Sequence, residues 1–318
     1  SAVFLKADFF PLTRQTAGAI YFIREEIRDE FLDEARQYKV QLTEISPEIF
    51  FSPVAERLYW VLDYWPVSRI PVTSISDAAK QLRRLGKRWI YAGGVNFRRG
   101  SLIAGEVRAA KEKILSFPVK AAHEHYRAFT LESAESLFVC EAPLKHAYAG
   151  GKMRFQEDRI GPPSRAYLKL YEALTLAGVV PGAADNVVDL GATPGGWSYV
   201  AASLGAAVQM IDRAAPDTAL LRKFPRLRFR KGDGLNPPQE ILAGATMIMS
   251  DMACEPAKLL PAVQKWLLPA KVRLMVCTLK IHGKSDKALI RRFAAIKGSE
   301  IYHLWHNGHE LTWVWQRA

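Results

Sequence analysis

The chain has 318 residues, 49% of them hydrophobic and 24% charged, a balance typical of a globular protein with more than one domain. It has no apolar run long enough to span a bilayer and no signal-peptide pattern at its N-terminus, so we expect a cytoplasmic protein without a membrane partner. The three cysteines, Cys140, Cys254 and Cys277, lie far apart, which excludes closely spaced zinc ligands and fits a reducing compartment.

The net charge of +12 is concentrated in the second half of the chain. Residues 1–150 carry 21 basic and 18 acidic residues, a net of +3, whereas residues 151–318 carry 23 and 14, a net of +9. A basic domain suggests a polyanionic partner, because neutralising phosphates releases bound counterions and so favours binding to nucleic acid. Charge that serves only solubility would give the same excess, so both explanations stay open.

The first half of the chain mixes strand and helix patterns. Three segments are rich in β-branched and aromatic residues and predict strands: 19–23, 57–65 and 137–142. Helical spacing appears over 23–38, and a helix over 75–86 starts at a serine or aspartate cap and stops at Gly86. We therefore expect a small α/β accessory domain over residues 1–150. The segment 143–163, with its Gly-Gly and Gly-Pro-Pro, predicts a linker or an ordered loop.

The second half, residues 151–318, alternates helices and strands regularly. A helix is predicted over 164–178, and strands are predicted over 186–192, 206–212, 227–233, 245–252, 272–280, 300–306 and 310–316. The first five strands are separated by enough residues for crossover helices, as parallel strands require. The last two are joined by 307–309, which predicts a hairpin. The fold class is therefore α/β, with a Rossmann-like, mostly parallel seven-stranded sheet and an antiparallel terminal strand.

A glycine-rich turn, DLGATPGGWS (189–198), follows the first strand of this half. Glycines at such a turn let the backbone approach a ligand at the carboxyl end of a parallel sheet. The next two strands end in Asp212 and Asp233, whose carboxylates suit the ribose hydroxyls and the adenine amino group of an adenosine. The GxGxxG pattern that cradles a pyrophosphate is broken by Thr193 and Pro194. The turn therefore favours S-adenosylmethionine over a dinucleotide.

The string DLGATPGGWS resembles the motif of the FtsJ/RrmJ-type RNA ribose 2′-O-methyltransferases, and the resemblance covers about residues 160–318. The segments PPSRAYLKL (162–170), SDMACEPAK (250–258) and IYHLWHNGHELT (301–312) most resemble the RlmM branch of this family, which acts on bacterial large-subunit rRNA. The resemblance implies a methyltransferase domain over 151–318, S-adenosylmethionine as cofactor, RNA as partner, with rRNA as the favoured substrate, and an accessory domain over 1–150 that binds RNA or substrate.

The same resemblance implies the site residues. The catalytic set is Lys169, Asp251, Lys280 and Glu310. The cofactor-binding set is Asp189, Gly191, Ala192, Pro194, Gly195, Gly196, Trp197, Asp212, Asp233 and Asp251. We expect four cations that follow the catalytic strand to contact RNA phosphates: Lys284, Lys287, Arg291 and Arg292.

Lys280 is the predicted general base, and it removes the proton of the ribose hydroxyl. A free lysine, with a pKa of about 10.4, is mostly protonated at neutral pH, so the base role predicts a depressed pKa. Burial, the Lys169 cation and the sulfonium of the cofactor favour this depression, whereas Asp251 opposes it. Asp251 is expected to orient Lys280, and Glu310 to hold Lys169 or the ribose.

Three alternatives differ from this interpretation. His309 and Glu310 begin an HExxH zinc motif, but position 313 is tryptophan, so no metal is expected. The acceptor ribose belongs to an mRNA cap or a tRNA in a second interpretation. In a third, the protein binds RNA but has lost catalysis, against which the presence of all four catalytic residue types argues. The sequence predicts no particular oligomeric state.

Overall fold

The computed structural model describes residues 16–119, 126–144, 148–281, 283 and 285–317. The chain divides into two compact units, unit 1 (Ser1–Lys113 and Lys120–Lys152) and unit 2 (Ile114–Val119 and Met153–Ala318). Residues 114–119 therefore belong with the second unit, which their position in the sequence did not indicate. Within the described ranges, no helix is long and apolar enough to cross a membrane.

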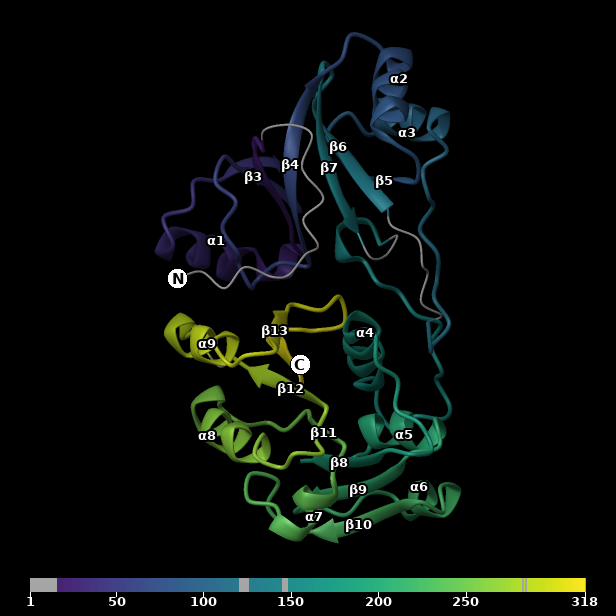
Figure 1. Cartoon of the computed structure of the whole chain (residues 1–318), viewed down its shortest axis with the longest axis vertical. Coiled ribbons are helices and arrows are strands. Elements are labelled where there is room, and N and C mark those ends of the chain that lie inside the picture. The colour runs from purple at the N-terminus through teal and green to yellow at the C-terminus, as the bar shows by residue number, and fades with distance from the viewer. Residues whose placement is uncertain (1–15, 120–125, 145–147, 282, 284, 318) are drawn as a thin grey trace. The chain divides into compact units, whose positions relative to one another are not determined.

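Unit 1 is built on a seven-stranded sheet with the order β2-β3-β1-β4-β7-β6-β5 (Figure 1). Its strands are β1 (Gly18–Phe22), β2 (Thr43–Ser46), β3 (Ile49–Ser52), β4 (Asp63–Pro71), β5 (Trp89–Gly94), β6 (Tyr126–Ser133) and β7 (Ser136–Leu144). Its helices are η1 (Glu25–Ile27), α1 (Arg28–Gln37), α2 (Ile75–Leu85), α3 (Phe97–Glu106) and η2 (Ala149–Gly151).

The long strand β4 joins the two halves of this sheet. Its first part pairs antiparallel with β1 and its last part pairs antiparallel with β7. Helices α2 and α3 contribute Leu82 and Ile103 to a core that they share with Phe129 of β6. Helix α2 ends at Gly86, which confirms the predicted stop. Its cap is Ser74, one residue before the predicted segment, whose hydroxyl accepts a hydrogen bond from the Asp77 N–H at 3.0 Å.

The strand predicted over 57–65 is wrong in its first part, because β4 begins only at Asp63. The buried carboxylate of Glu34 accepts the backbone N–H groups of Tyr59 and Trp60, each at 3.0 Å. A side chain therefore satisfies backbone groups that a neighbouring strand would otherwise satisfy. The apolar side chains of this segment are still buried, with Leu58 fully inaccessible to solvent.

Unit 2 contains a second seven-stranded sheet with the order β10-β9-β8-β11-β12-β14-β13. Its strands are β8 (Asn186–Leu190), β9 (Ala207–Asp212), β10 (Leu227–Lys231), β11 (Met247–Ser250), β12 (Leu274–Lys280), β13 (Ser299–Tyr302) and β14 (Glu310–Gln316). Its helices are α4 (Tyr167–Ala177), α5 (Gly196–Ser203), α6 (Thr218–Lys223), α7 (Gln239–Gly244), α8 (Pro256–Trp266) and α9 (Lys287–Ala294).

This sheet confirms the predicted Rossmann-like class. The strands β8 to β12 pair in parallel, and the chain-terminal β14 pairs antiparallel with both β12 and β13. Helices α4 and α5 lie on one side of the sheet and α8 and α9 on the other (Figure 1). The connection between the last two strands runs over residues 303–309 and is longer than the hairpin turn predicted at 307–309. β13, and not the antiparallel β14, forms the edge of the sheet.

The segment 114–119 is joined to the rest of unit 2 by backbone hydrogen bonds and ring contacts. The Leu115 N–H donates to the Arg154 carbonyl, and the Gln156 N–H donates to the Leu115 carbonyl, both at 2.8 Å. The ring of Phe117 stacks on Tyr171 of α4 with centroids 3.9 Å apart. This segment therefore supports the helix that carries Lys169.

Candidate active site

The four predicted catalytic residues come from four separate elements of unit 2. Lys169 lies in the first turn of α4, Asp251 directly follows β11, Lys280 ends β12 and Glu310 begins β14. β11 and β12 are parallel neighbours, so their carboxyl ends place Asp251 and Lys280 at the same edge of the sheet. The antiparallel register of β12 with β14 pairs Lys280 with Glu310.

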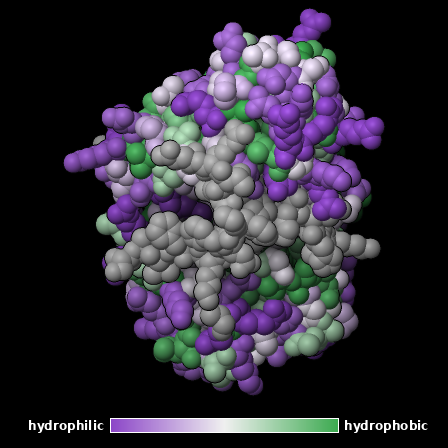
Figure 2. All heavy atoms as spheres, turned by 45° about the horizontal axis from the view of Figure 1, so that its top comes forward, coloured by the Kyte–Doolittle hydropathy of each residue, from purple (hydrophilic) through white to green (hydrophobic). Residues whose placement is uncertain are grey.

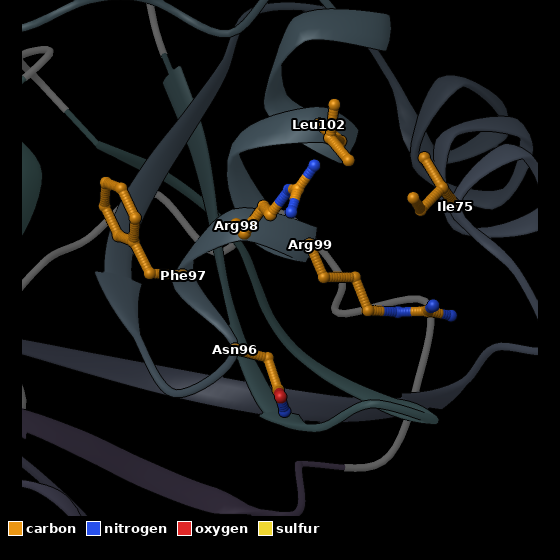
Figure 3. Close-up of a pocket in the computed structure, with 6 residues that line it drawn as sticks. All are labelled: Ile75, Asn96, Phe97, Arg98, Arg99 and Leu102. Atoms are coloured by element: carbon orange, nitrogen blue, oxygen red, sulfur yellow. The ribbon is translucent and has the colours of Figure 1, made fainter.

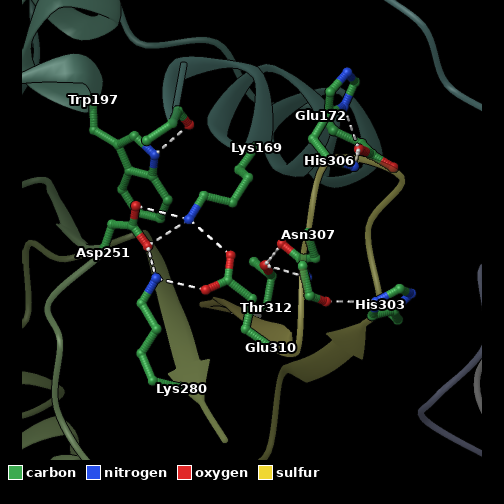
Figure 4. A network of polar contacts seen from close by, with 12 residues as sticks. Lys169, Glu172, Trp197, Asp251, Lys280, His303, His306, Asn307, Glu310 and Thr312 are labelled. Atoms are coloured by element: carbon green, nitrogen blue, oxygen red, sulfur yellow. Dashed lines mark hydrogen bonds and ion pairs between the residues drawn. The ribbon is translucent and has the colours of Figure 1, made fainter. Parts of the chain in front are cut away.

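These side chains form one alternating cluster of two cations and two anions (Figure 4). Lys169 Nζ lies 2.7 Å from Asp251 Oδ1 and 2.9 Å from Glu310 Oε1. Lys280 Nζ lies 3.0 Å from Asp251 Oδ1 and 2.5 Å from Glu310 Oε2. Their side chains are 9 to 21% exposed. Since burial makes an unpaired charge costly, removing one member destabilises the charges that remain.

The cluster shifts the pKa of two of its members. Burial alone would raise the pKa of Asp251, but the neighbouring Lys169 and Lys280 cations outweigh it and lower that pKa. Burial alone would lower the pKa of Lys280, but the Asp251 and Glu310 carboxylates outweigh it and raise that pKa. Two carboxylates therefore face Lys280 and favour its ammonium form.

The predicted depression of the Lys280 pKa is thus wrong for the protein by itself. The sequence identified Asp251 as an opposing charge, but it assigned Glu310 to Lys169 or the ribose and not to Lys280. In the structure Glu310 bridges both lysines, so two carboxylates and not one lie beside the Lys280 ammonium. The expected contacts of Glu310 with Lys169 and of Asp251 with Lys280 are both present.

The glycine-rich turn lies at the carboxyl end of β8, where the loops after β8, β10 and β11 meet. Gly191 has a φ of +71°, and a Cβ there would lie 2.8 Å from the Cβ of Met252. A Cβ at Gly234 would lie 2.9 Å from the Gly191 backbone nitrogen. Such close approach excludes a side chain at either position. The turn also places Gly195, with a φ of +108°, and Gly196 at the start of α5, with Ala192 buried and Pro194 exposed.

Asp212 and Asp233 lie at the adjacent strand ends, as predicted. Asp212 accepts hydrogen bonds from the Thr193 N–H at 2.9 Å and the Ala214 N–H at 3.0 Å, so its carboxylate is fixed against the turn. Asp233 accepts from Asn236 Nδ2 at 2.9 Å. Because each carboxylate oxygen has two acceptor sites, both side chains can accept further bonds from a ligand.

Two residues of the predicted cofactor set lie beneath the turn and are buried. Asp189 is 1% exposed and accepts a hydrogen bond from the Ser198 hydroxyl at 2.6 Å. Trp197 is 3% exposed, and its indole N–H donates to the Ala166 carbonyl at 2.8 Å, directly before α4 (Figure 4). In the structure Asp189 therefore braces the turn, and Trp197 ties the turn to the helix that carries Lys169.

The predicted RNA-contacting cations differ in their placement. Arg291 and Arg292 are exposed in the last turn of α9. Lys287 is only 5% exposed, so its ammonium does not face solvent as a phosphate contact requires. Lys284 lies outside the described residues.

The sequence interpretation missed Glu172 and Met252, which lie beside the predicted residues. Glu172 is a lone acid three positions after Lys169 in an otherwise apolar helical segment, and this spacing was the signal available. Met252 follows Asp251 directly and closes over Gly191. Among the residues that the structure describes, no group of three or more His, Cys, Asp or Glu side chains is arranged to hold a metal ion.

Residues 162–302 match the sequence model of the FtsJ-like methyltransferase family. This segment lies within unit 2 and is similar in sequence to the FtsJ-like methyltransferases. The matched segment contains three of the four clustered residues, Lys169, Asp251 and Lys280, and the family that it resembles is one of enzymes.

Curated relatives extend the similarity into unit 1. "Ribosomal RNA large subunit methyltransferase M" of Pectobacterium atrosepticum is 24% identical over 292 residues, which cover 85% of this chain and 75% of that protein. The protein of the same name from Marinomonas sp. is 26% identical over 270 residues, which cover 76% of this chain and 74% of that protein. Among solved structures, a putative hemolysin from Streptococcus thermophilus has a TM-score of 0.40 at 18% identity, covering 56% of this chain and 76% of that chain. A fibrillarin pre-rRNA processing protein from Methanococcus jannaschii has a TM-score of 0.36 at 17% identity, covering 48% and 77%.

Proposed function

We propose that the protein transfers a methyl group from S-adenosylmethionine to a ribose 2′-hydroxyl of large-subunit rRNA. The observation that carries this proposal is the Lys169–Asp251–Lys280–Glu310 cluster at the carboxyl edge of the sheet, next to the glycine-rich turn. The relatives named for large-subunit rRNA methylation, three quarters of whose length this chain covers, support the choice of RNA. We propose the cytoplasm as the compartment of the reaction.

The residues around the turn fit S-adenosylmethionine. Gly191 and Gly234 leave backbone exposed where side chains cannot be accommodated, and Asp212 and Asp233 offer carboxylates for the ribose hydroxyls and the adenine amino group of the cofactor. When bound, the cofactor supplies an electrophilic methyl group on a sulfonium. Asp251 is one residue from Met252, which closes over the turn, so the cofactor and the cluster are adjacent in the fold.

The chain's own residues align the acceptor and manage its proton. Methyl transfer is an in-line displacement, so holding the hydroxyl oxygen in position supplies much of the rate. We assign Lys280 to the acceptor oxygen as the group that takes its proton. Asp251 and Glu310 hold the Lys280 side chain, and Lys169 holds these two carboxylates. Because two carboxylates raise the pKa of Lys280, the neutral amine is a small fraction at pH 7 and grows with pH.

Unit 1 is proposed to bind the RNA through a surface at the start of α3 (Figure 3). A shallow pocket of about 420 Å³ there is lined by Ile75, Asn96, Phe97, Arg98, Arg99 and Leu102. Phe97 is 67% exposed, and within the described part of the chain neither guanidinium group forms a hydrogen bond or ion pair. Unpaired guanidinium groups suit phosphates, and an exposed ring suits base stacking. On the face shown in Figure 2, hydrophilic side chains predominate and enclose small hydrophobic patches.

The decisive experiment offers purified protein and labelled S-adenosylmethionine to three unmodified RNAs: large-subunit rRNA, tRNA and capped mRNA. We expect label in the rRNA, at a 2′-O-methyl position that is lost from cells lacking the protein. Label only in tRNA or in the cap would replace the proposed substrate and keep the chemistry. The remaining outcome is a folded protein that binds the cofactor but labels none of the three RNAs, nor the rRNA within an assembling ribosomal subunit. This result would support the alternative of an inactive RNA-binding protein.

A further inference from the structure

Glu172 is a buried carboxylate on α4, one helical turn after Lys169, and it is 2% exposed. Its Oε1 accepts the Trp305 backbone N–H at 2.8 Å, and its Oε2 accepts the His306 backbone N–H at 3.2 Å. Oε2 also lies 2.8 Å from Nδ1 of the His306 ring (Figure 4). A buried carboxylate is costly unless it is hydrogen-bonded, so these contacts to one short segment stabilise it there.

The segment that Glu172 holds, residues 303–309, leads directly into Glu310 of the catalytic cluster. It is also tied to β14 and to itself. The Asn307 side chain and the Thr312 hydroxyl hydrogen-bond to each other at 3.2 Å, and His303 Nε2 lies 3.1 Å from the Gly308 carbonyl oxygen. A shift of its first half is therefore transmitted to the start of β14.

We propose that Glu172 is a positioning residue for the methyl transfer, acting through residues 303–309 to fix Glu310 against Lys169 and Lys280. Lys169 and Glu172 lie three positions apart and so share one face of α4. The first holds Glu310 and the second holds residues 305 and 306, so one helix face fixes the segment at two points. The kinetic part of this inference rests on the proposed function.

The test compares Glu172→Gln with the wild-type protein in steady-state methylation of large-subunit rRNA. Glutamine keeps the shape, but its amide NH₂ faces N–H donors in place of one acceptor oxygen. We expect kcat to fall about 10- to 100-fold while KM for RNA and for S-adenosylmethionine changes less than about threefold, because misplacement of reacting groups by about 1 Å costs this much.

Two sets of variants separate positioning from stability. Glu34→Gln is the matched control, because Glu34 is also buried and also accepts backbone N–H groups, but in unit 1. It should lower the thermal midpoint and leave kcat of the folded protein unchanged. His306→Asn keeps a donor near Nδ1 and should retain most of the activity, whereas His306→Ala should lose roughly tenfold in kcat. If Glu172→Gln fails to fold, the His306 pair decides.

Amide hydrogen exchange over residues 303–310 tests without RNA whether Glu172 holds this segment. We expect faster exchange in Glu172→Gln than in Glu34→Gln. Wild-type kcat in folded Glu172→Gln, or equal kcat in the two His306 variants, would overturn the positioning role. A wild-type protein that methylates no RNA contradicts the proposed function. Faster exchange in that case still supports the hold of Glu172 on the segment.

Discussion

Lys280 and Glu310 are direct cross-strand partners in the pairing of β12 with β14, and Lys280 Nζ lies 2.5 Å from Glu310 Oε2. The register of the sheet therefore sets this contact, since a slip of one residue would turn either side chain to the opposite face. Glu310 also holds Lys169 of α4, so a single carboxylate links the sheet edge to the helix. The terminal antiparallel strand thus completes the cluster of two lysines and two carboxylates.

Replacing Lys280 by alanine should abolish most of the methylation. Loss of a positioned proton acceptor typically costs about 10²- to 10⁴-fold, and we expect kcat on rRNA to fall within this range. Cofactor affinity, measured by calorimetry, should change less than about threefold, because Lys280 is not in the predicted cofactor-binding set and, among the described residues, touches only one member of it, Asp251. Lys265→Ala, at an exposed lysine of α8, is the control. Unchanged methylation by Lys280→Ala would refute the assignment.

Glu310→Gln should shift the pH dependence of kcat to lower pH. Glu310 is one of the two carboxylates that raise the pKa of Lys280, so its neutralisation lets that pKa fall. Below the pKa of Lys280, kcat rises with pH, and in Glu310→Gln this rise should occur at lower pH, although the maximal kcat is lower because Lys280 is held less well. Glu240→Gln, which breaks the exposed pair with Arg230, should leave the profile in place. A shift to higher pH would contradict the electrostatic argument.

The sequence predicted the strand ends of unit 2 well, for a physical reason. Asp251 and Lys280 follow buried strands, and the carboxyl ends of parallel strands must meet at one edge. The contact between Glu172 and residues 305 and 306 was not predictable in this way, because it joins elements more than 130 positions apart through side-chain and loop geometry. The same limit explains the error over 57–65, where Glu34 satisfies the backbone that the aromatic pattern assigned to a strand.

Gly191→Ala should weaken the binding of S-adenosylmethionine by at least about tenfold, or about 1.4 kcal/mol. The new Cβ would lie 2.8 Å from Met252 Cβ, and the φ of +71° is unfavourable for alanine, so the turn must move. Gly182→Ala is the matched control, because nothing lies within 4 Å of the Cβ that it adds. Calorimetric titration with S-adenosylmethionine measures both, and equal affinities would show that the turn does not line the cofactor site.

Reversing the charge of Arg98 and Arg99 together to glutamate should weaken RNA binding without affecting cofactor binding. The slope of log K against log salt is negative, and each lost phosphate contact makes it less negative by about 0.7 to 0.9. The slope of the double variant should therefore be less negative by about 1.5. Arg36→Glu is the control, since Arg36 is exposed but lies on α1 beside Asp33. Filter binding at several salt concentrations measures the slope. A slope equal to that of the wild type would remove this surface from the RNA-binding site.

Asp189→Asn should flatten the pH dependence of stability below neutrality. Burial, assisted by the nearby Asp251 and Asp212 carboxylates and opposed by the hydrogen bond from Ser198, raises the pKa of Asp189 to about 7. A group whose folded pKa exceeds its unfolded value of 3.8 stabilises the fold fully below pH 3.8, and this contribution is lost as the pH rises toward 7. Between pH 5 and 7 the wild type should therefore lose unfolding free energy relative to Asp189→Asn, and above about pH 7.5 the two curves should run parallel. Thermal unfolding in a pH series measures the difference, with Asp217→Asn, at an exposed helix cap, as the control. Parallel curves across the whole range would mean that Asp189 is already ionised at pH 5, and that the Ser198 hydrogen bond outweighs its burial.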